Sequence, residues 1–197
     1  MTLPYSQACE NNKGPILEVL QPLFDNVTTV LEIGSGTGQH AEFFAAAMPH
    51  LTWQTTDMAD NLSGIQQRID QARLRNVPPV IEFDVNRHQL PNGKFDAVFT
   101  ANTLHIMSWR TVEQMFATIS SLLNPRGQLC IYGPFNYGGT YTSGSNELFD
   151  QSLRSRNAQM GIRDIEKVQQ LAQCFNFNHL KDYQMPANNR LLHFYRR

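Results

Sequence analysis

The sequence predicts a single α/β domain built on an open, mostly parallel sheet with helices on both faces. Short β-branched or apolar segments alternate with segments whose apolar residues recur at helical spacing. No repeat, low-complexity segment or proline-rich linker divides the chain. The 197 residues, 41% of them hydrophobic, suffice for one sizeable core, so we expect one domain over residues 1–197.

Each element follows from a local pattern. The first helix is expected over residues 14–24, because Pro15 suits a first helical turn and an apolar stripe follows it. Strands are expected at residues 27–33, 51–56, 80–83, 95–100 and 128–132. Helices are expected after the first strand through residue 48, around residues 62–69, and at residues 112–122.

The C-terminal part predicts two more helices and two more strands. The helices are expected at residues 145–157 and 164–175, the second with Asp164 as its N-cap, and the strands at residues 179–184 and 190–195. The connection at residues 185–189 is too short for a parallel crossover. The last strand should therefore run antiparallel to its predecessor.

The charge balance favours a small or neutral ligand. Lys and Arg number 16 against 17 Asp and Glu, with a formal charge of −1 and no block of like charges, which argues against long nucleic acid or an anionic membrane as partner. Residues 1–14 lack a secretory signal pattern, and the longest apolar run, residues 43–48, is too short to span a bilayer. We expect a cytoplasmic protein.

The cysteines and histidines indicate neither a disulfide framework nor a metal site. The three cysteines lie far apart without a C-x-x-C motif, and the six histidines form no H-E-x-x-H motif or i, i+4 pair. We expect no metal. The sequence leaves the oligomeric state open.

A glycine-rich segment joins the first predicted strand to the helix that follows it, namely Glu32-Ile33-Gly34-Ser35-Gly36-Thr37-Gly38. Glycines permit a tight turn and let backbone N–H groups approach a ligand, and the following helix N-terminus offers a positive dipole end. Asp57 closes the second strand, 19 residues after Gly38, the spacing at which an acid accepts hydrogen bonds from ribose hydroxyls.

A second acid closes the third strand. Asp84 should lie beside Asp57 at the carboxyl edge, where it can accept a hydrogen bond from an adenine amine while Val85 or Met58 packs on the ring. A dinucleotide turn requires G-x-G-x-x-G, but position 39 is Gln. Glu32 would repel a pyrophosphate and attract an ammonium group through an ordered water, which favours a sulfonium cofactor over a nicotinamide.

The motif series VLEIGSGTG, Asp57, FDVN, FDAVFTANTLH and LNPRGQLCIYGPF, between residues 30 and 135, resembles class I S-adenosylmethionine-dependent methyltransferases. More narrowly, ENNKGPILEVL, YTSGSNELFDQSLRSRN, GIRDIEK and MPANN resemble a methyltransferase-like family catalogued as a domain of unknown function. The resemblance implies a Rossmann-like, seven-stranded sheet with an antiparallel last strand, S-adenosylmethionine as cofactor and S-adenosylhomocysteine as product, and no established substrate.

The resemblance also assigns roles by position. It makes the Gly34-Ser35-Gly36-Thr37-Gly38 turn the cradle of the methionine moiety, Asp57 the ribose acceptor and Asp84 the adenine contact. Asn102 would face the transferred methyl. Relatives that methylate adenine N6 or glutamine amides carry Asn/Asp-Pro-Pro-Tyr/Phe after this strand, whereas this chain has Asn102-Thr103-Leu104-His105, which argues against those substrates.

The substrate should lie outside the carboxyl ends of the parallel strands. Residues 1–26 would form an N-terminal lid and helix, residues 27–135 the cofactor-binding core, and residues 136–197 a substrate-side insertion with the closing strands. Aromatic and amide side chains from these loops would line the substrate pocket, namely Tyr5, Trp109, Phe135, Asn136 and Asn188. His105 is the histidine expected near the methyl, as a candidate base.

The leading hypothesis is methyl transfer to an unidentified small molecule by in-line displacement. A non-catalytic protein that binds adenosylmethionine or adenosylhomocysteine would keep the same cradle. A nicotinamide-dependent oxidoreductase is a further alternative. So is an RNA or protein methyltransferase that uses Arg154, Arg156 and Arg163 as a positive patch, although a solvated helical face explains those arginines better.

Overall fold

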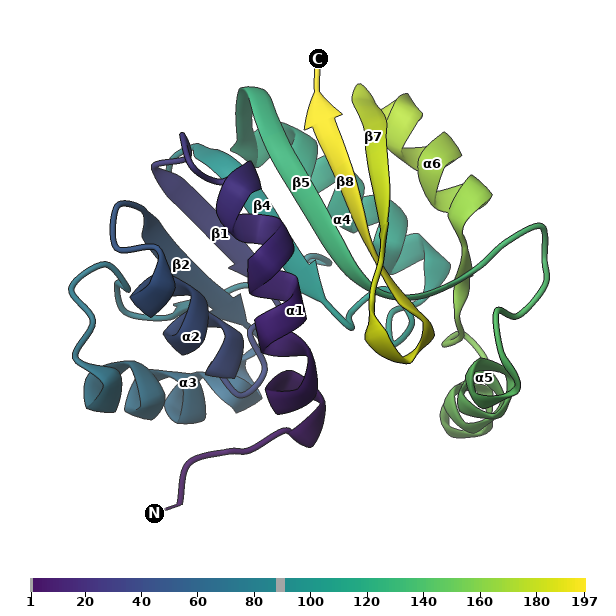
Figure 1. Cartoon of the computed structure of the whole chain (residues 1–197), viewed down its shortest axis with the longest axis horizontal. Helices are drawn as coiled ribbons and strands as arrows, with labels where there is room; N and C mark the ends of the chain where they lie inside the picture. The colour runs from purple at the N-terminus through teal and green to yellow at the C-terminus, as the bar shows by residue number, and fades with distance from the viewer. Residues whose placement is uncertain (1, 88–90) are drawn as a thin grey trace.

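The computed structural model describes residues 2–87 and 91–197 as one mixed α/β sheet with helices on both faces (Figure 1). The central strands are β1 (Thr29–Ile33), β2 (Thr52–Asp57), β4 (Phe95–Ala101) and β5 (Leu123–Asn136). The path runs β3-β2-β1-β4-β5-β8-β7, with β3 at Ile81–Glu82, β7 at Phe177–Gln184 and β8 at Asn189–Arg196. The predicted seven-stranded sheet is confirmed, and the two-residue β6 (Arg163–Asp164) pairs with β5 off this path.

The strand directions confirm the predicted antiparallel last strand. The neighbours β1–β2, β1–β4, β2–β3 and β4–β5 are parallel, whereas β8 runs antiparallel to both β5 and β7. The short connection through the 3-10 helix η1 (Pro186–Asn188) inserts β8 between β5 and β7. The final hairpin therefore folds back into the sheet beside the central strands.

The helices are α1 (Gln7–Leu23), α2 (Gln39–Ala47), α3 (Ala59–Ala72), α4 (Trp109–Leu122), α5 (Gly144–Arg156) and α6 (Ile165–Cys174). The expected first helix was too short, because Ser6 caps α1 by accepting a hydrogen bond from the backbone N–H of Cys9. Pro15 consequently lies inside α1 and not in its first turn. Asp164 occupies the N-cap position of α6 as predicted, but its side chain makes no capping hydrogen bond.

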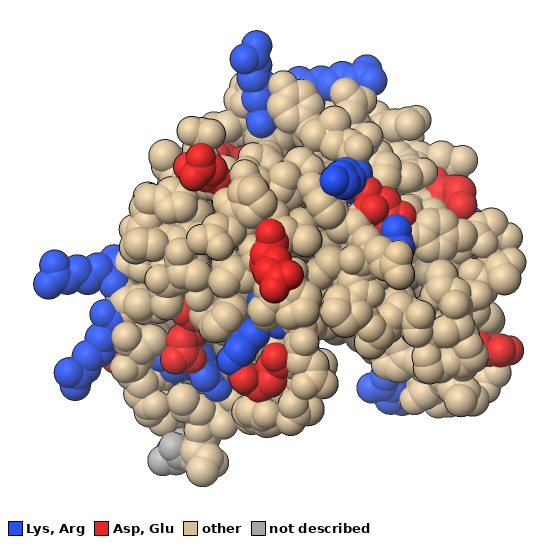
Figure 2. All heavy atoms as spheres, in the orientation of Figure 1, with Lys and Arg blue, Asp and Glu red and all other residues tan. Residues whose placement is uncertain are grey.

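The carboxyl ends of β1 and β4 meet at one edge of the sheet (Figure 1). In the same orientation, Figure 2 shows a notch at this edge between the N-terminal part of α1 and α5. Charged side chains on the visible face are scattered and of mixed sign. The topology therefore opens a cleft where the sequence places the glycine turn.

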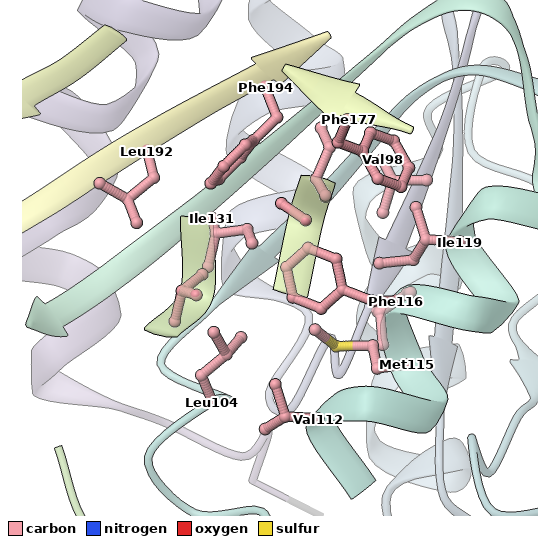
Figure 3. Close-up of a cluster of buried hydrophobic side chains, with 14 of the residues drawn as sticks. Val98, Leu104, Val112, Met115, Phe116, Ile119, Ile131, Phe177, Leu192 and Phe194 are labelled. Carbon is pink, nitrogen blue, oxygen red and sulfur yellow. The ribbon is translucent and has the colours of Figure 1, made fainter. Parts of the chain in front are cut away.

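Two hydrophobic cores cover the two faces of the sheet. On one face, Val98 and Ile131 pack against α4 and α6, and Figure 3 shows Phe116 and Ile119 of α4 among the buried side chains. On the other face, α1, α2 and α3 pack against alternate strand residues such as Phe99. This alternation follows from the two-residue period of a strand. Close packing on both faces of the sheet then holds the strand ends in place.

Within the described residues, no helix is long and apolar enough to cross a membrane.

Candidate active site

The glycine turn joins β1 to α2. Gly34 has φ +73°, and a Cβ atom there would lie 2.7 Å from Cγ2 of Thr103, so close packing requires glycine. Gly36 has φ +59°, but a Cβ atom on it would meet no atom within 4 Å, since this residue lies at the wall of a cavity. The backbone N–H groups of Gly34 and Ser35 donate to the Thr56 carbonyl at 3.1 and 3.0 Å, which locks the turn onto β2.

Asp57, at the end of β2, supports the turn directly. Its Oδ2 accepts a hydrogen bond from the backbone N–H of Gly36 at 2.6 Å. Its Oδ1 accepts from the backbone N–H of Met58 at 2.7 Å and from Nδ2 of Asn61 at 2.8 Å. The carboxylate is therefore aimed at the glycine turn, while the Met58 side chain is 56% exposed beside it.

Asp84 lies two residues beyond Glu82, the register partner of Asp57. Its Oδ1 accepts a hydrogen bond from the backbone N–H of Asn86 at 2.9 Å, and Oδ2 lies 3.5 Å from the Arg87 guanidinium. Val85 is buried in the core beneath this loop. The acids predicted for the cofactor thus close two neighbouring strands at one edge.

A cavity of about 540 Å³ lies at the carboxyl ends of β1, β4 and β5. The residues Gly34 to Thr37 form one wall, and Asn102 and His105 form another. The N-terminal half of α1 covers it, α5 contributes Phe149, and η1 and the start of β8 contribute Pro186 and Asn189. The cavity thus joins the glycine turn to the residues that follow β4.

Asn102 and His105 converge inside this cavity. Asn102 adopts a left-handed conformation (φ +59°), which asparagine tolerates well, and its backbone N–H donates to the Tyr132 carbonyl at 2.8 Å. A Cβ atom on Gly133 would lie 3.8 Å from both Oδ1 of Asn102 and Nδ1 of His105, so the two side chains lie over the same glycine.

His105 is buried and neutral at physiological pH. Burial, together with the positive charges of Arg163 and Arg156, lowers its pKa to about 4. Its ring meets the Phe149 ring edge-on, with centroids 5.1 Å apart. A neutral imidazole has an unprotonated nitrogen, which can accept a proton.

The opposite wall of the cavity contains polar residues that sequence reasoning missed. His40 of α2 lies with Nε2 2.6 Å from Oδ1 of Asn12 of α1, and burial lowers the His40 pKa to about 4. Burial raises the pKa of Tyr132, although its hydrogen bonds with Asn12 and Asn189 oppose that change. The ENN run before the first predicted helix was the available signal for Asn12, but no apolar stripe marked it as helical.

The segment predicted as an N-terminal lid is hydrogen-bonded to α2 and α3, and through them to the glycine turn, in this structure. Oε1 of Gln39 accepts hydrogen bonds from the backbone N–H of Ser6 at 2.6 Å and from the Thr37 hydroxyl at 2.8 Å. The Arg68 guanidinium donates to the carbonyls of Pro4 at 2.6 Å and Thr37 at 2.7 Å. Gln39, the residue that breaks the dinucleotide pattern, therefore ties the N-terminal segment to the glycine turn.

Glu32 does not reach the cavity. Its Oε2 accepts hydrogen bonds from the Ser35 hydroxyl at 2.8 Å and the Trp53 indole at 3.1 Å. Burial raises its pKa to about 7. The side chain lies behind the turn, where it holds Ser35 in place.

A sequence-family model described as "Protein of unknown function (DUF938)" matches residues 3–196. The chain belongs to the DUF938 family. This match covers nearly all of the chain and confirms the resemblance to a methyltransferase-like domain of unknown function.

Solved methyltransferase structures share the fold of this DUF938 chain. An O-methyltransferase family protein from Burkholderia thailandensis is 17% identical with a TM-score of 0.83, over 93% of this chain and 56% of that one. A family 2 O-methyltransferase from Planctomyces limnophilus in complex with apigenin is 15% identical with a TM-score of 0.76, over 86% and 51%. PigF with SAH is 15% identical with a TM-score of 0.77, over 88% and 58%. The DUF938 chain thus spans between half and three fifths of these proteins, and identities this low show the fold alone.

The structure separates the five residues predicted to contact substrate. Phe135 is 1% exposed and packs in the core, because it faces the side of β5 opposite to Pro134, which lines the cavity. Trp109 and Asn136 line a second cavity of about 710 Å³, beside Arg163. Tyr5 is 64% exposed outside the cavity, and Asn188 is exposed between two lining residues. None of these five side chains lines the cavity at the glycine turn.

Over residues 2–87 and 91–197, no group of three His, Cys, Asp or Glu side chains is placed to hold a metal ion.

Proposed function

We propose that this chain transfers a methyl group from S-adenosylmethionine to a small-molecule acceptor. The observation that carries the proposal is one cavity bounded by the glycine turn after β1 and by Asn102 and His105 after β4. Ligands of open α/β sheets bind at such carboxyl ends, where the strand order reverses. Cofactor and acceptor would therefore meet in a single cleft.

The residues present fit the cofactor. A ligand can occupy the open space over Gly36, and a side chain at this position would fill that space. The Gly34–Gly38 turn would cradle the methionine moiety, and Asp57 would accept hydrogen bonds from the ribose hydroxyls. Asp84 would accept one from the adenine amine, with the exposed Met58 packing on the ring, whereas Val85 lies in the core. Glu32 would act indirectly, by holding Ser35.

The bound cofactor supplies an electrophilic methyl group on a sulfonium, so the protein mainly aligns the reactants. Asn102 would face the methyl group and limit the position of the acceptor. His105, with an unprotonated ring nitrogen at neutral pH, would take the proton of a hydroxyl acceptor. These roles require both side chains in one cavity, where they converge over Gly133.

The same proposal includes a reducing compartment, the cytoplasm. Cys9, Cys130 and Cys174 are all free thiols. Unpaired cysteines are typical of proteins that work where thiols stay reduced.

Ligand-induced stabilisation tests the cofactor first. We expect adenosylhomocysteine to raise the Tm in a concentration-dependent way and NADH to leave it unchanged. Stabilisation by NADH alone would overturn the proposal in favour of an oxidoreductase. Methyl transfer is then measured with labelled S-adenosylmethionine in a metabolite extract, where binding without any transfer would favour the non-catalytic alternative.

A further inference from the structure

The half of the cavity away from the glycine turn carries no charge. Its lining residues are prolines, alanine, asparagines, tyrosine and phenylalanine, from β5, α5, η1 and the start of β8. In the parts of the chain that the structure describes, no Lys, Arg, Asp or Glu lines any part of this cavity. Methyl acceptors with a formal charge would therefore find no opposite charge in its walls.

Two charged side chains behind these walls, Arg163 and Asp150, make hydrogen bonds with other groups. The Arg163 guanidinium donates to the main-chain carbonyls of Leu104 and Met107, behind the loop that carries His105. Asp150 of α5 accepts hydrogen bonds from Arg154 at 2.6 Å and from the backbone N–H of Ile162 at 2.6 Å. These contacts hold the charged groups outside the lining of the cavity.

On the α1 side, Glu10 is held in the same way. It accepts hydrogen bonds from Lys13 at 2.6 Å and from Nε2 of Gln39 at 2.5 Å. The two histidines of the cavity, His40 and His105, are neutral at pH 7 because burial lowers their pKa values to about 4. The cavity therefore offers uncharged hydrogen-bonding groups and apolar surface.

The acceptor half also offers an apolar face. The ring of Phe149 is 37% exposed and stands edge-on to the His105 ring at 5.1 Å. Pro134 and Pro186 add rigid apolar surface. A flat ring fits such a wall better than a polar chain does, because aromatic contact adds to the hydrophobic gain.

We propose that the acceptor is a neutral ring compound with a hydroxyl group, and that the acceptor half of the cavity disfavours carboxylates, phosphates and ammonium groups on the acceptor. This inference rests on the proposed methyl transfer. A charge moved from water into walls without a partner charge loses solvation without compensation. During transfer the hydroxyl oxygen bonds to the methyl carbon as the carbon–sulfur bond breaks, the electron pair remains on sulfur, and the proton goes to His105.

Three phenols of similar size test this charge selectivity. The probes are 4-hydroxybenzyl alcohol, which is neutral, 4-hydroxybenzoate, an anion, and tyramine, a cation. We expect kcat/KM, or affinity for the protein saturated with adenosylhomocysteine, to be at least about tenfold higher for the neutral probe. Equal or better use of either charged probe would overturn the proposal, as would failure of all three to bind.

A pair of variants on α5 sharpens the test. Phe149→Arg places a guanidinium in the wall, and we expect it to shift the preference toward 4-hydroxybenzoate by at least about tenfold. Leu148→Arg adds the same charge at the adjacent residue, which is 68% exposed and does not line the cavity, so the preference should stay unchanged. An unchanged preference in Phe149→Arg, or an equal shift in both variants, would contradict the proposal.

Adenosylhomocysteine affinity separates the two levels of inference. If the wild-type protein does not bind adenosylhomocysteine, the proposed function itself is overturned. Normal affinity together with no charge preference would remove only the inference about the acceptor.

Discussion

The backbone N–H of Gly36 donates a hydrogen bond to Oδ2 of Asp57 over 2.6 Å. Residues from the ends of two neighbouring parallel strands are thereby joined at the sheet edge. The carboxylate that shapes the turn is also the one proposed to accept hydrogen bonds from the ribose hydroxyls. One side chain thus couples the conformation of the cradle to the proposed binding of the cofactor.

Asp57→Ala should weaken adenosylhomocysteine binding by about 10- to 100-fold, because a charge-assisted hydrogen bond contributes about 1.5–3 kcal/mol. Titration calorimetry measures the change. Asp70→Ala, which removes an exposed carboxylate on α3, is the matched control and should bind as the wild type does. Unchanged affinity in Asp57→Ala would remove this acid from the cofactor site.

Gly36→Ala should weaken adenosylhomocysteine binding, since its methyl group would occupy the open space at the cavity wall. A left-handed alanine should also cost about 1 kcal/mol of stability. Gly138→Ala is the matched control, because Gly138 has φ +55° with no neighbour within 4 Å and lies outside the cavity. Both variants should lose similar stability by urea denaturation, and only Gly36→Ala should lose affinity.

His105→Ala should reduce kcat by about 100-fold or more if the imidazole takes the acceptor proton. The Kd for adenosylhomocysteine should stay within about twofold, because the proposed role concerns the acceptor. Steady-state kinetics and calorimetry give the two values, with exposed His50→Ala as the control. Equal losses in binding and turnover would instead indicate that His105 only supports the fold of the loop.

Gln39→Ala should loosen the N-terminal wall without unfolding the domain. The variant removes the acceptor of the Ser6 N–H group, so amide exchange over residues 6–10 should accelerate by about tenfold or more. Hydrogen exchange with mass spectrometry reads this segment directly. Gln71→Ala, an exposed substitution on α3, should leave the exchange unchanged. Exchange as slow as in the wild type would show that Arg68 alone holds the segment.

His40 should make the protein sensitive to acid. Burial lowers its pKa from 6.5 to about 4, so between these pH values the folded state binds fewer protons than the unfolded state. Its contribution to stability is fully present above about pH 6.5 and disappears as the pH falls toward 4. His40→Gln should therefore flatten the loss of stability over this range, by up to about 3 kcal/mol. Urea denaturation at pH 7, 5.5 and 4 checks it, and parallel curves would disprove it.

Strand ends were predictable because their signals are local. A β-branched run stopped by glycines predicts β1 and its turn, and Asp57 and Asp84 each directly follow a strand pattern. In a parallel sheet such ends meet at one edge, so the neighbourhood of the two acids followed without coordinates. The positions of the glycine turn and of the two acids were accordingly predictable from the sequence.

The substrate side was not predictable in the same way. Phe135 and Pro134 are adjacent in sequence, yet the pleat of β5 sends one into the core and leaves the other at the cavity. The contact of Asn12 with His40 joins α1 to α2 across 28 positions, and no periodicity records it. Which loop side chains converge depends on packing between elements.

By itself, the sequence determined the order of elements, the antiparallel last strand and the glycine turn with its two acids, because hydrophobic period and chain connectivity act locally. Only the tertiary structure decided that α1 begins at Gln7 and walls the cavity, that Glu32 lies behind the turn, and that no charged side chain among the described residues lines the cavity. Those features depend on which distant side chains share a buried volume, a property of the packed chain.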